Sequence, residues 1–317
     1  MKKPKRTIGG VDTSVRVADI FLSNCVINAS GPRDATHSEL EKIANSKSGA
    51  IMMKSCTIKS RIGNKKPRYR KTNLGSVQSM GLPNLGYKKY IEFSQKLAKY
   101  KKPLIASIAG LKPDDYETML RAFQESKVDA VEINLSCPNI SGKGQLAYNI
   151  SETERLLKKL QKYEKKVKGL KLPAFLEIYY FEKYAEMIKK YQISFVTCIN
   201  SIAGSLIIDA KKESAVIKPN GGMGGLCGEY IKPVALGNVR KFYKVLDKNV
   251  KIFGVGGVRR GEDVFEYILA GAEAVQVGTQ FEAEGIKCFE RINKELEALM
   301  VNKKYSRLSD FKGKIKN

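Results

Sequence analysis

A single thiol stands between two amides in the segment N-L-S-C-P-N, which runs from Asn134 to Asn139. The segment follows apolar, β-branched residues that begin at Ala130, so we expect it at the end of a strand. A cysteine in such a place is suited to proton transfer, and the alternative is a small buried side chain that only packs. Cys137 is therefore the sharpest candidate for a catalytic group.

The other groups that could transfer protons have less favourable settings. Cys25 and Cys198 lie within or beside apolar runs and are expected to pack in a core. His37, the sole histidine, is expected in the first helix and has no evident partner. The six cysteines are scattered without a C-x-x-C pair, which indicates neither a zinc site nor a disulfide framework. Acid–base work would fall to a thiol, a lysine or a carboxylate.

Short apolar runs alternate with longer amphipathic, charged stretches along almost the whole chain, which is the pattern of strands alternating with helices. The expected strands are residues 26–31, 50–55, 103–110, 130–137, 169–173, 194–201, 251–257 and 274–279. The expected helices include residues 38–46, 113–126, 151–168, 181–190, 233–246 and 262–269. Residues 151–154 offer N-cap candidates for the third of these helices, and Gly169 is expected to end it.

Eight such units predict an α/β fold of the closed (β/α)8 TIM-barrel type, in preference to an open doubly wound sheet. Two connections are long, residues 56–102 after the second strand and 202–232 after the sixth, and long connections in a barrel usually build the site. No linker rich in Pro, Gly or Ser divides the sequence, so residues 1–317 are interpreted as one domain.

In a barrel, the carboxyl ends of the strands converge on one mouth. Glycines follow the last two expected strands, as Gly256-Gly257 and Gly278-Thr279. Backbone N–H groups at these two loops form the usual phosphate site of the fold, which predicts a phosphorylated ligand. Tight turns that need glycine are the alternative interpretation.

Lysines and amides end other expected strands. Lys54 and Lys171 would face the mouth, where a buried ammonium group must meet a counter-charge such as a ligand anion. Asn134, Asn139 and Asn200 would present amides, which both donate and accept and so suit a planar imide or amide ring. Surface lysines and asparagines in turns are the alternatives.

The formal net charge of +25 raises the question of nucleic-acid binding. The lysines are spread over every expected helix and no nucleic-acid-binding motif is recognisable, so no specific nucleic-acid partner is expected. No apolar run is long enough for a membrane span, and the basic N-terminus lacks the apolar segment of a secretory signal. We expect a soluble cytoplasmic protein with reduced thiols, whose positive field favours acidic small molecules.

Over nearly its whole length the sequence resembles class 1A dihydroorotate dehydrogenase, the fumarate-linked type of this enzyme family. The resemblance is carried by N-A-S-G-P from Asn28, M-K-S at Lys54, S-M-G-L-P-N from Ser79, N-L-S-C-P-N, Q-L-A-Y from Gln145, G-L-K-L-P at Lys171, F-V-T-C-I-N-S ending at Ser201, I-K-P-V-A-L-x-N-V from Ile231, G-V-G-G-V and V-Q-V-G-T. Together these motifs are highly specific.

The resemblance implies a barrel that holds FMN, with the flavin phosphate at the two glycine loops. It places the ring near Ala29, Ser30 and Gly31, and Lys171 against the N1/O2 edge, where a cation stabilises the anionic reduced flavin. The full set of cofactor-binding residues that it implies is Ala29, Ser30, Gly31, Lys54, Ser55, Asn134, Lys171, Ile199, Gly228, Gly256, Gly257, Gly278 and Thr279.

The same resemblance implies that Cys137, as a thiolate, takes the C5 proton of dihydroorotate while hydride passes from C6 to flavin N5. Fumarate would then enter the same pocket and take hydride from the flavin and a proton from Cys137. The implied substrate-binding residues are Lys54, Gln78, Met80, Gly81, Leu82, Asn134, Asn139, Asn200 and Ser201. A homodimer is implied as well.

Three departures from the family's motifs border the expected ligands. Gln78 stands where the family has an asparagine, which keeps the amide and extends its reach by one methylene. Cys227 interrupts a glycine-rich loop, residues 224–228, and would shift that loop if its position needed a positive φ or a close approach to the flavin. Residues 201–205, S-I-A-G-S, replace the family's S-[IV]-G-N-G.

Other interpretations stay open. A fifth strand over residues 174–178 would put Glu177, an anion, at the flavin edge in place of Lys171; we prefer Lys171 because G-L-K-L-P matches the family without a gap from Cys137. An NAD-coupled or dihydrouracil-type dehydrogenase of the same fold is the nearest functional rival. A basic binding protein on a barrel that has lost its activity is the non-enzymatic one.

Overall fold

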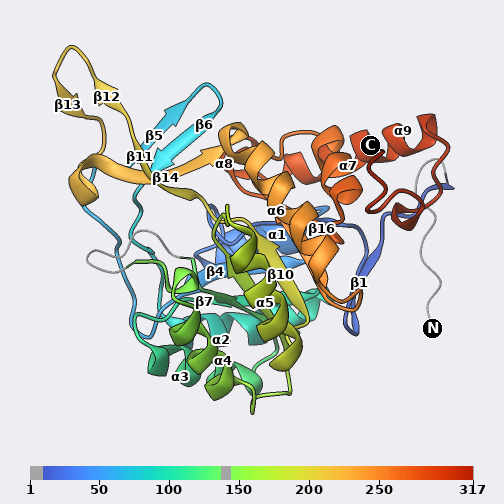
Figure 1. The fold of residues 1–317 in the computed structure, drawn as a ribbon, viewed down its shortest axis with the longest axis horizontal. Helices are drawn as coiled ribbons and strands as arrows, with labels where there is room; N and C mark the ends of the chain where they lie inside the picture. Colours follow the sequence, from blue (N-terminus) through green and yellow to red (C-terminus); the bar gives the residue numbers. More distant parts are fainter. Residues whose placement is uncertain (1–9, 137–143, 317) are drawn as a thin grey trace.

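The computed structural model describes residues 10–136 and 144–316, so Cys137 and Asn139 lie outside the described residues. Eight parallel strands form a nearly closed barrel with helices around it (Figure 1). In spatial order they are β3 (Val26–Asn28), β16 (Ala274–Val277), β15 (Lys251–Val255), β10 (Phe195–Cys198), β9 (Val167–Leu172), β8 (Ala130–Asn134), β7 (Leu104–Ile108) and β4 (Ile51–Cys56). Every expected strand is present, and the predicted TIM barrel is confirmed.

The barrel closes between β3 and β4 through a side chain. These two strands end the order of the sheet and have no ladder between them. The Asn28 Nδ2 donates to the carbonyl of Met52 at 2.7 Å, and its Oδ1 accepts from the Met52 N–H at 2.9 Å. Because an amide both donates and accepts, Asn28 replaces a pair of ladder hydrogen bonds at this seam.

The helices lie outside the barrel (Figure 1). They are α1 (His37–Ala44), α2 (Tyr87–Leu97), α3 (Pro113–Gln124), α4 (Ile150–Leu160), α5 (Ile178–Lys190), α6 (Lys232–Val245), α7 (Gly261–Ala270), α8 (Thr279–Glu284) and α9 (Lys287–Asn302). A capping box starts α1: the Thr36 hydroxyl accepts from the Glu39 N–H at 3.3 Å, and the Glu39 carboxylate accepts from the Thr36 N–H at 2.9 Å.

The third expected helix, residues 151–168, is too long. Helix α4 ends at Leu160, and its N-cap is Asn149, whose side chain accepts from the Glu152 N–H at 3.1 Å. Gly169 does not end a helix but lies within β9. A Cβ there would come within 2.1 Å of the Phe195 ring, so this glycine is needed for packing inside the barrel.

The two long connections meet in one antiparallel sheet. The first provides β5 (Tyr69–Thr72) and β6 (Gly75–Gln78), and the second provides β11 (Ile202–Leu206) and β14 (Met223–Gly228), in the order β11-β14-β6-β5. The second also carries a hairpin of β12 (Ile208–Asp209) and β13 (Ser214–Ala215), which projects away from the barrel (Figure 1). Because β14 pairs with β6, segments more than a hundred residues apart are fixed against each other.

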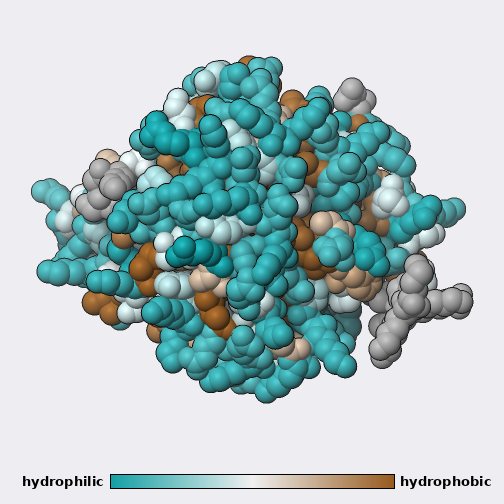
Figure 2. Space-filling view, turned by 90° about the horizontal axis from the view of Figure 1, so that it is seen from below, coloured by the Kyte–Doolittle hydropathy of each residue, from teal (hydrophilic) through white to brown (hydrophobic). Residues whose placement is uncertain are grey.

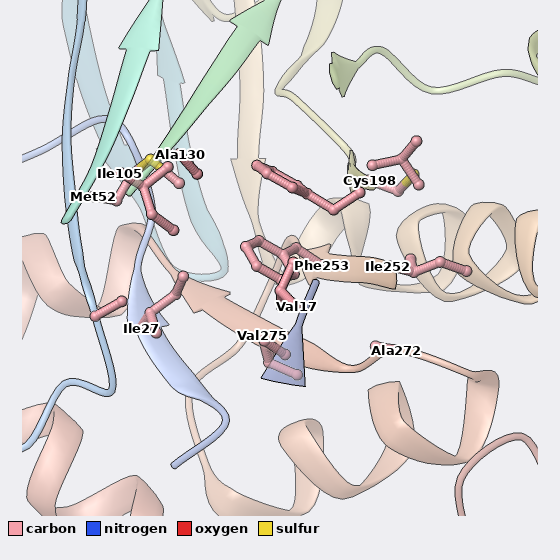
Figure 3. Close-up of a cluster of buried hydrophobic side chains, with 14 of the residues drawn as sticks. Val17, Ile27, Met52, Ile105, Ala130, Cys198, Ile252, Phe253, Ala272 and Val275 are labelled. Atoms are coloured by element: carbon pink, nitrogen blue, oxygen red, sulfur yellow. The ribbon is translucent and has the colours of Figure 1, made fainter. Parts of the chain in front are cut away.

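Apolar side chains fill the amino-terminal part of the barrel. The Phe195 and Phe253 rings stack with centroids 4.8 Å apart. Val17, from the hairpin of β1 (Val15–Val17) and β2 (Ile20–Leu22), joins the same cluster as Phe253 and Val275 (Figure 3). Packing of this kind stabilises the fold at roughly 25 cal/mol per Å² of apolar surface buried.

The surface is strongly hydrophilic, with hydrophobic side chains only in small patches on the face that Figure 2 shows. Many lysines pair with helix carboxylates, as Lys89 and Lys96 do with Glu92 at 2.8 and 3.0 Å. Such exposed pairs contribute little to stability, and they fit the interpretation of the lysines as solvated. Among the described residues, no helix has both the length and the apolar character that a membrane crossing requires.

Candidate active site

Two lysines from different strands reach the mouth of the barrel. Lys54, on β4, donates to the Gly31 carbonyl, and its Nζ lies 4.0 Å from Asp34 Oδ1. Lys171, on β9, is 5% exposed, and its Nζ donates to the Ser30 carbonyl at 3.4 Å. Both ammonium groups therefore lie against the loop that follows β3, in a largely buried setting that favours an anionic ligand.

Asp34 is the carboxylate beside these lysines, and it was not among the predicted site residues. Its side chain is fully buried; Oδ2 accepts from the Gly31 N–H at 2.8 Å, and Oδ1 has no hydrogen-bond partner. Burial raises the pKa of Asp34 to about 7, although the charges of Lys54 and Lys171 oppose that rise. Asp34 could have been predicted from the sequence, because it follows the predicted strand 26–31 and stands two residues after Pro32.

Two of the predicted amides are tied to the end of β8. Asn134 Oδ1 accepts from the N–H and the hydroxyl of Ser136 at 3.1 and 3.0 Å. Asn200 Nδ2 donates to the carbonyl and the hydroxyl of Ser136 at 2.9 and 3.0 Å. Ser136, which sequence reasoning missed, therefore joins the loops after β8 and β10, directly before the segment that contains Cys137.

Gln78 joins three predicted substrate segments. Its Nε2 lies 3.3 Å from Ser201 Oγ, and its Oε1 accepts from the Met80 N–H at 3.1 Å. The Ser201 N–H in turn donates to Asn200 Oδ1 at 2.8 Å. The amide of Gln78 thus spans from the first long connection to the loop after β10, which makes use of its longer side chain.

The loop after Gln78 is held in an uncommon backbone conformation. Gly81 and Leu82 have φ of +73° and +55°. A Cβ on Gly81 would come within 2.3 Å of Asn64 Oδ1, so both the conformation and the space require glycine. Leucine rarely adopts a positive φ, and such strain concentrates at binding sites.

Cys227 does not occupy a position with a positive φ. Cys227 lies in β14, opposite Ser76 of β6, and the positive φ in this segment, +87°, belongs to Gly228. Burial raises the pKa of the Cys227 thiol, and hydrogen bonds with Ser76, Gln78 and Ser201 partly offset that rise. The glycine-rich segment therefore keeps glycine where the backbone requires it.

The glycines predicted for the phosphate lie in two loops at the mouth. Gly256 and Gly257 follow β15 with φ of +133° and +70°, and a Cβ on Gly257 would come within 3.0 Å of the Gly228 carbonyl oxygen. Gly278 and Thr279 follow β16, where α8 begins. The first loop packs backbone against backbone at Gly257, and the second leaves room beside Gly278.

The remaining predicted residues lie in or directly after β3, β4 and β10. Ala29 continues β3, and its N–H donates to the Val277 carbonyl at 3.0 Å. Ser30 Oγ lies 3.0 Å from Ser55 Oγ, which also accepts from Asn134 Nδ2 at 3.1 Å. Ile199 is buried directly after β10.

The choice of Lys171 over Glu177 for the fifth strand agrees with the structure. Strand β9 runs from Val167 to Leu172 and so contains Lys171, opposite Asn134 of β8 and Thr197 of β10. Glu177 is exposed at the start of α5.

The predictions for Cys25 and Cys198 are confirmed, and the prediction that His37 lacks a partner is wrong. Cys25 and Cys198 are buried, and burial raises the pKa of Cys25 to about 12. His37 does have a partner, because its Nδ1 lies 3.5 Å from Glu41 Oε2 one helical turn away. Across residues 10–136 and 144–316, no cluster of His, Cys, Asp or Glu could hold a metal ion.

The mouth has room and unmet polar groups for a flat, anionic cofactor. A Cβ on Gly31 would meet nothing within 4 Å, and one on Gly278 only the Ala29 Cβ at 3.6 Å. Gln276 on β16 is fully buried, and neither polar atom of its side chain has a partner. Buried polar groups are normally satisfied, so Gln276 and the two lysines fit a bound polar molecule such as a flavin.

Comparison with known proteins agrees with this geometry. Residues 13–300 match the family model described as dihydroorotate dehydrogenase. The chain is 44% identical over 309 residues to a Streptococcus pyogenes protein and 43% identical to one from Streptococcus pneumoniae, both named dihydroorotate dehydrogenase A (fumarate). Each alignment covers 96% of this chain and 99% of the relative.

Its fold is similar to that of a solved structure from Eimeria tenella, a DHODH in complex with ferulenol. The TM-score is 0.80, the identity is 19%, and the alignment covers 95% of this chain and 88% of the other. The family model and the streptococcal relatives span nearly the whole chain. This chain belongs to the dihydroorotate dehydrogenase family.

Proposed function

We propose that this protein oxidises dihydroorotate to orotate in pyrimidine biosynthesis, with FMN as its cofactor and fumarate as the electron acceptor. The names of the streptococcal relatives support the substrate and the acceptor. The observation that carries the proposal is the convergence of Lys54, Lys171 and the amides of Asn134 and Asn200 where β8 leads toward Cys137.

Residues from both glycine loops and from the ends of β3, β4, β8, β9 and β10 would hold FMN. They are Ala29, Ser30, Gly31, Lys54, Ser55, Asn134, Lys171, Ile199, Gly228, Gly256, Gly257, Gly278 and Thr279. Bound there, FMN would supply the hydride acceptor that no amino-acid side chain can provide. The chain supplies backbone N–H groups for the phosphate and the positive charge of Lys171 for the ring.

The substrate would lie beside the cofactor, against the amides and the left-handed loop. Its site would comprise Lys54, Gln78, Met80, Gly81, Leu82, Asn134, Asn139, Asn200 and Ser201. Lys54 offsets the substrate carboxylate, and the amides pair with the imide edge of the pyrimidine. Fumarate, also a dicarboxylate-like molecule, would use the same positive charges in the second half-reaction.

Cys137 would remove the C5 proton of dihydroorotate and return a proton to fumarate. The thiolate is the competent base. Since a positioned base contributes 10²–10⁴-fold to a rate, its loss should slow the first half-reaction by about that factor at neutral pH.

The decisive experiment mixes purified protein with dihydroorotate without oxygen and follows the absorbance of the oxidised flavin. The band should disappear rapidly in the wild type and about 10²–10⁴-fold more slowly in Cys137→Ala. Cys25→Ala is the matched control, because that thiol is buried at the amino end of β3, and it should bleach at the wild-type rate. Fumarate, and not NAD, should then restore the oxidised band.

Two results would contradict the proposal. Bleaching of Cys137→Ala at full speed would remove the assignment of the base. Recovery of the oxidised band with NAD, or bleaching by dihydrouracil in place of dihydroorotate, would favour the related dehydrogenases of the same fold.

We also propose a homodimer. Leu206, Ile208 and Met223 on β11, β12 and β14 are 46%, 62% and 50% exposed, and Leu206 lies opposite Met223 in the sheet, so an apolar group is exposed there. Light scattering behind a sizing column should give twice the mass of 35.3 kDa, and Ile208→Lys should shift the protein toward the monomer if this hairpin takes part.

A further inference from the structure

A continuous set of hydrogen bonds leads from the mouth into the interior of the barrel. Ser30 Oγ and Ser55 Oγ are 3.0 Å apart, Ser55 Oγ and Ser107 Oγ are 2.8 Å apart, and Ser107 Oγ lies 3.2 Å from Glu132 Oε1. The chain crosses the seam between β3 and β4 and then passes to β7 and β8. We call these four residues the serine–glutamate chain.

Three members of this chain are shut off from solvent. Ser55 is 3% exposed, and Ser107 and Glu132 are 0% exposed, whereas Ser30 is partly exposed at the mouth. Glu132 also accepts from Thr197 Oγ1 of β10, through Oε2, at 2.7 Å. A carboxylate in so dry a place must be hydrogen-bonded, and each of its oxygens has one hydroxyl donor.

The chemistry of the four groups fixes the direction of every hydrogen bond between them. Ser107 donates its single hydroxyl hydrogen to Glu132 Oε1. Ser55 must then donate to Ser107, and Ser30 must donate to Ser55. Asn134 Nδ2 fills the remaining acceptor position of Ser55, which leaves that oxygen fully used.

Ser30 is therefore left as an acceptor. Its hydrogen is committed to Ser55, and one lone pair receives the Ser55 N–H at 2.8 Å. One lone pair remains, on the one member of the chain that is partly exposed. A ligand that meets Ser30 Oγ must bring an N–H or O–H group.

We propose that Glu132 is a positioning residue that orients this chain so that Ser30 presents a hydrogen-bond acceptor to a donor group of the bound cofactor. The inference rests on the proposed function, because FMN is the ligand expected against Ser30. Glu132 touches neither cofactor nor substrate; it acts through Ser107 and Ser55. Without it, the hydroxyls could reverse, and Ser30 could present a hydrogen where the cofactor also has one.

The test uses the flavin-loaded protein and two readouts, the dissociation constant of FMN from its fluorescence on dilution and the midpoint potential of the bound flavin. Ser107→Ala interrupts the chain without changing any charge. It should weaken FMN about threefold to tenfold, the effect of one hydrogen bond between neutral groups. It should also raise the midpoint potential, because an acceptor oxygen beside the ring disfavours added electrons.

Thr197→Val is the matched control. It removes the other hydroxyl that binds the same carboxylate and leaves the three serines connected. The FMN dissociation constant should therefore stay within about twofold of the wild-type value. The midpoint potential should not change. Glu132→Met, which has similar length and no acceptor, should reproduce Ser107→Ala. If Glu132→Met does not fold, the FMN dissociation constant and midpoint potential of Ser107→Ala still test the proposal.

A double-mutant cycle separates orientation from simple loss of packing. Once Ser30→Ala has removed the acceptor, adding Ser107→Ala should weaken FMN no further, so the two effects should be strongly non-additive. Additive effects, or an unchanged dissociation constant and potential in Ser107→Ala, would overturn the inference while leaving the proposed function intact. A wild-type protein that binds no FMN would overturn both.

Discussion

The two halves of the barrel interior differ sharply although the same strands build both. On β7, β8 and β10 the amino half contributes Ile105, Ala130 and Phe195, and the carboxyl half, two residues further on, contributes Ser107, Glu132 and Thr197. The first set packs in the hydrophobic cluster, and the second forms hydrogen bonds. Two residues along each strand, the interior thus changes from an apolar layer that stabilises the fold to a polar layer that faces the candidate site.

The comparison of the apolar and polar halves shows which residues should affect stability and which should affect function. The apolar half is complete by itself, because its rings fill the space over Gly169. The polar half holds the buried carboxylate of Asp34 with one unpaired oxygen, the unpaired amide of Gln276, and two lysines. Burial of these polar groups is unfavourable, and a bound ligand would offset that energy by pairing with them. Substitutions in the first should therefore change mainly the free energy of unfolding, whereas loss of Lys171 or Ser107 in the second should change the rate or ligand binding.

The largest effect on stability is expected for Phe253→Ala in the apolar half. Removal of a ring stacked on Phe195 leaves a cavity in a closed barrel and should lower the free energy of unfolding by about 3–5 kcal/mol. Denaturant unfolding measures this loss. Phe253→Leu should lose clearly less, and the midpoint potential of the bound flavin should not change in either variant. A large change in potential would mean that the two halves are not separable.

The next largest effect is expected for Lys171→Met in the polar half. Removing the one cation placed for the ring should slow flavin reduction by about 10²–10³-fold, as does loss of a preorganised electrostatic group elsewhere. Lys168→Met is a close control: Lys168 is on the same strand and also 5% exposed, but its Nζ binds the Gln161 carbonyl on the outer side. Equal slowing in both variants would show that strand integrity, and not the charge, was measured.

The apolar half of the fold was largely predictable from the sequence, since buried parallel strands read as apolar, β-branched runs. The errors come from tertiary contacts that no local pattern encodes. Gly169 resembled the end of a helix, but the Phe195 ring requires it to lack a side chain. The hydrogen bonds of Asn28 across the seam could not be predicted without the order of the strands.

The polar half was predictable only in part. Lys54, Lys171 and the amides were found because they end strands or match family motifs. Their mutual contacts, such as that between Gln78 and Ser201, link residues 123 positions apart and depend on the antiparallel sheet of the long connections. Glu132 did carry a signal, as a single charge inside the apolar run A-V-E-I-N, at a spacing of two from Asn134.

A smaller effect, dependent on pH, is expected for Asp34→Asn. The folded pKa of Asp34 is raised to about 7 from its ordinary value of 3.8, so between these values the folded protein holds a proton that the unfolded chain has lost. This group's contribution to stability is therefore present at low pH and is lost as the pH rises toward 7. Relative to Asp34→Asn, the wild type should lose about 3 kcal/mol between pH 5 and pH 8.

Denaturant unfolding of both proteins across that pH range, without substrate, checks this prediction. A constant difference between the two proteins would mean that Lys54 and Lys171 compensate the buried carboxylate fully. In that case the polar half would be electrostatically complete before a ligand binds, and the contrast with the apolar half would weaken.

The smallest effect is expected at the seam, where the two halves meet. Asn28→Ala removes both hydrogen bonds to Met52 and leaves a buried N–H and a buried carbonyl unpaired, which should cost about 1–3 kcal/mol of unfolding free energy. Asn28→Asp keeps the acceptor for the Met52 N–H but sets a buried carboxylate oxygen against the Met52 carbonyl, so it should not recover the loss. Hydrogen exchange at the Met52 amide should speed up more in Asn28→Ala than exchange at Ile105 within the β4–β7–β8 ladders, because only the former depends on the side chain.

Unchanged exchange at Met52 would mean that the polar contacts above it, from Ser30 to Ser55 and from Lys54 to Gly31, hold the seam by themselves. The site would then stabilise the barrel as much as the barrel positions the site.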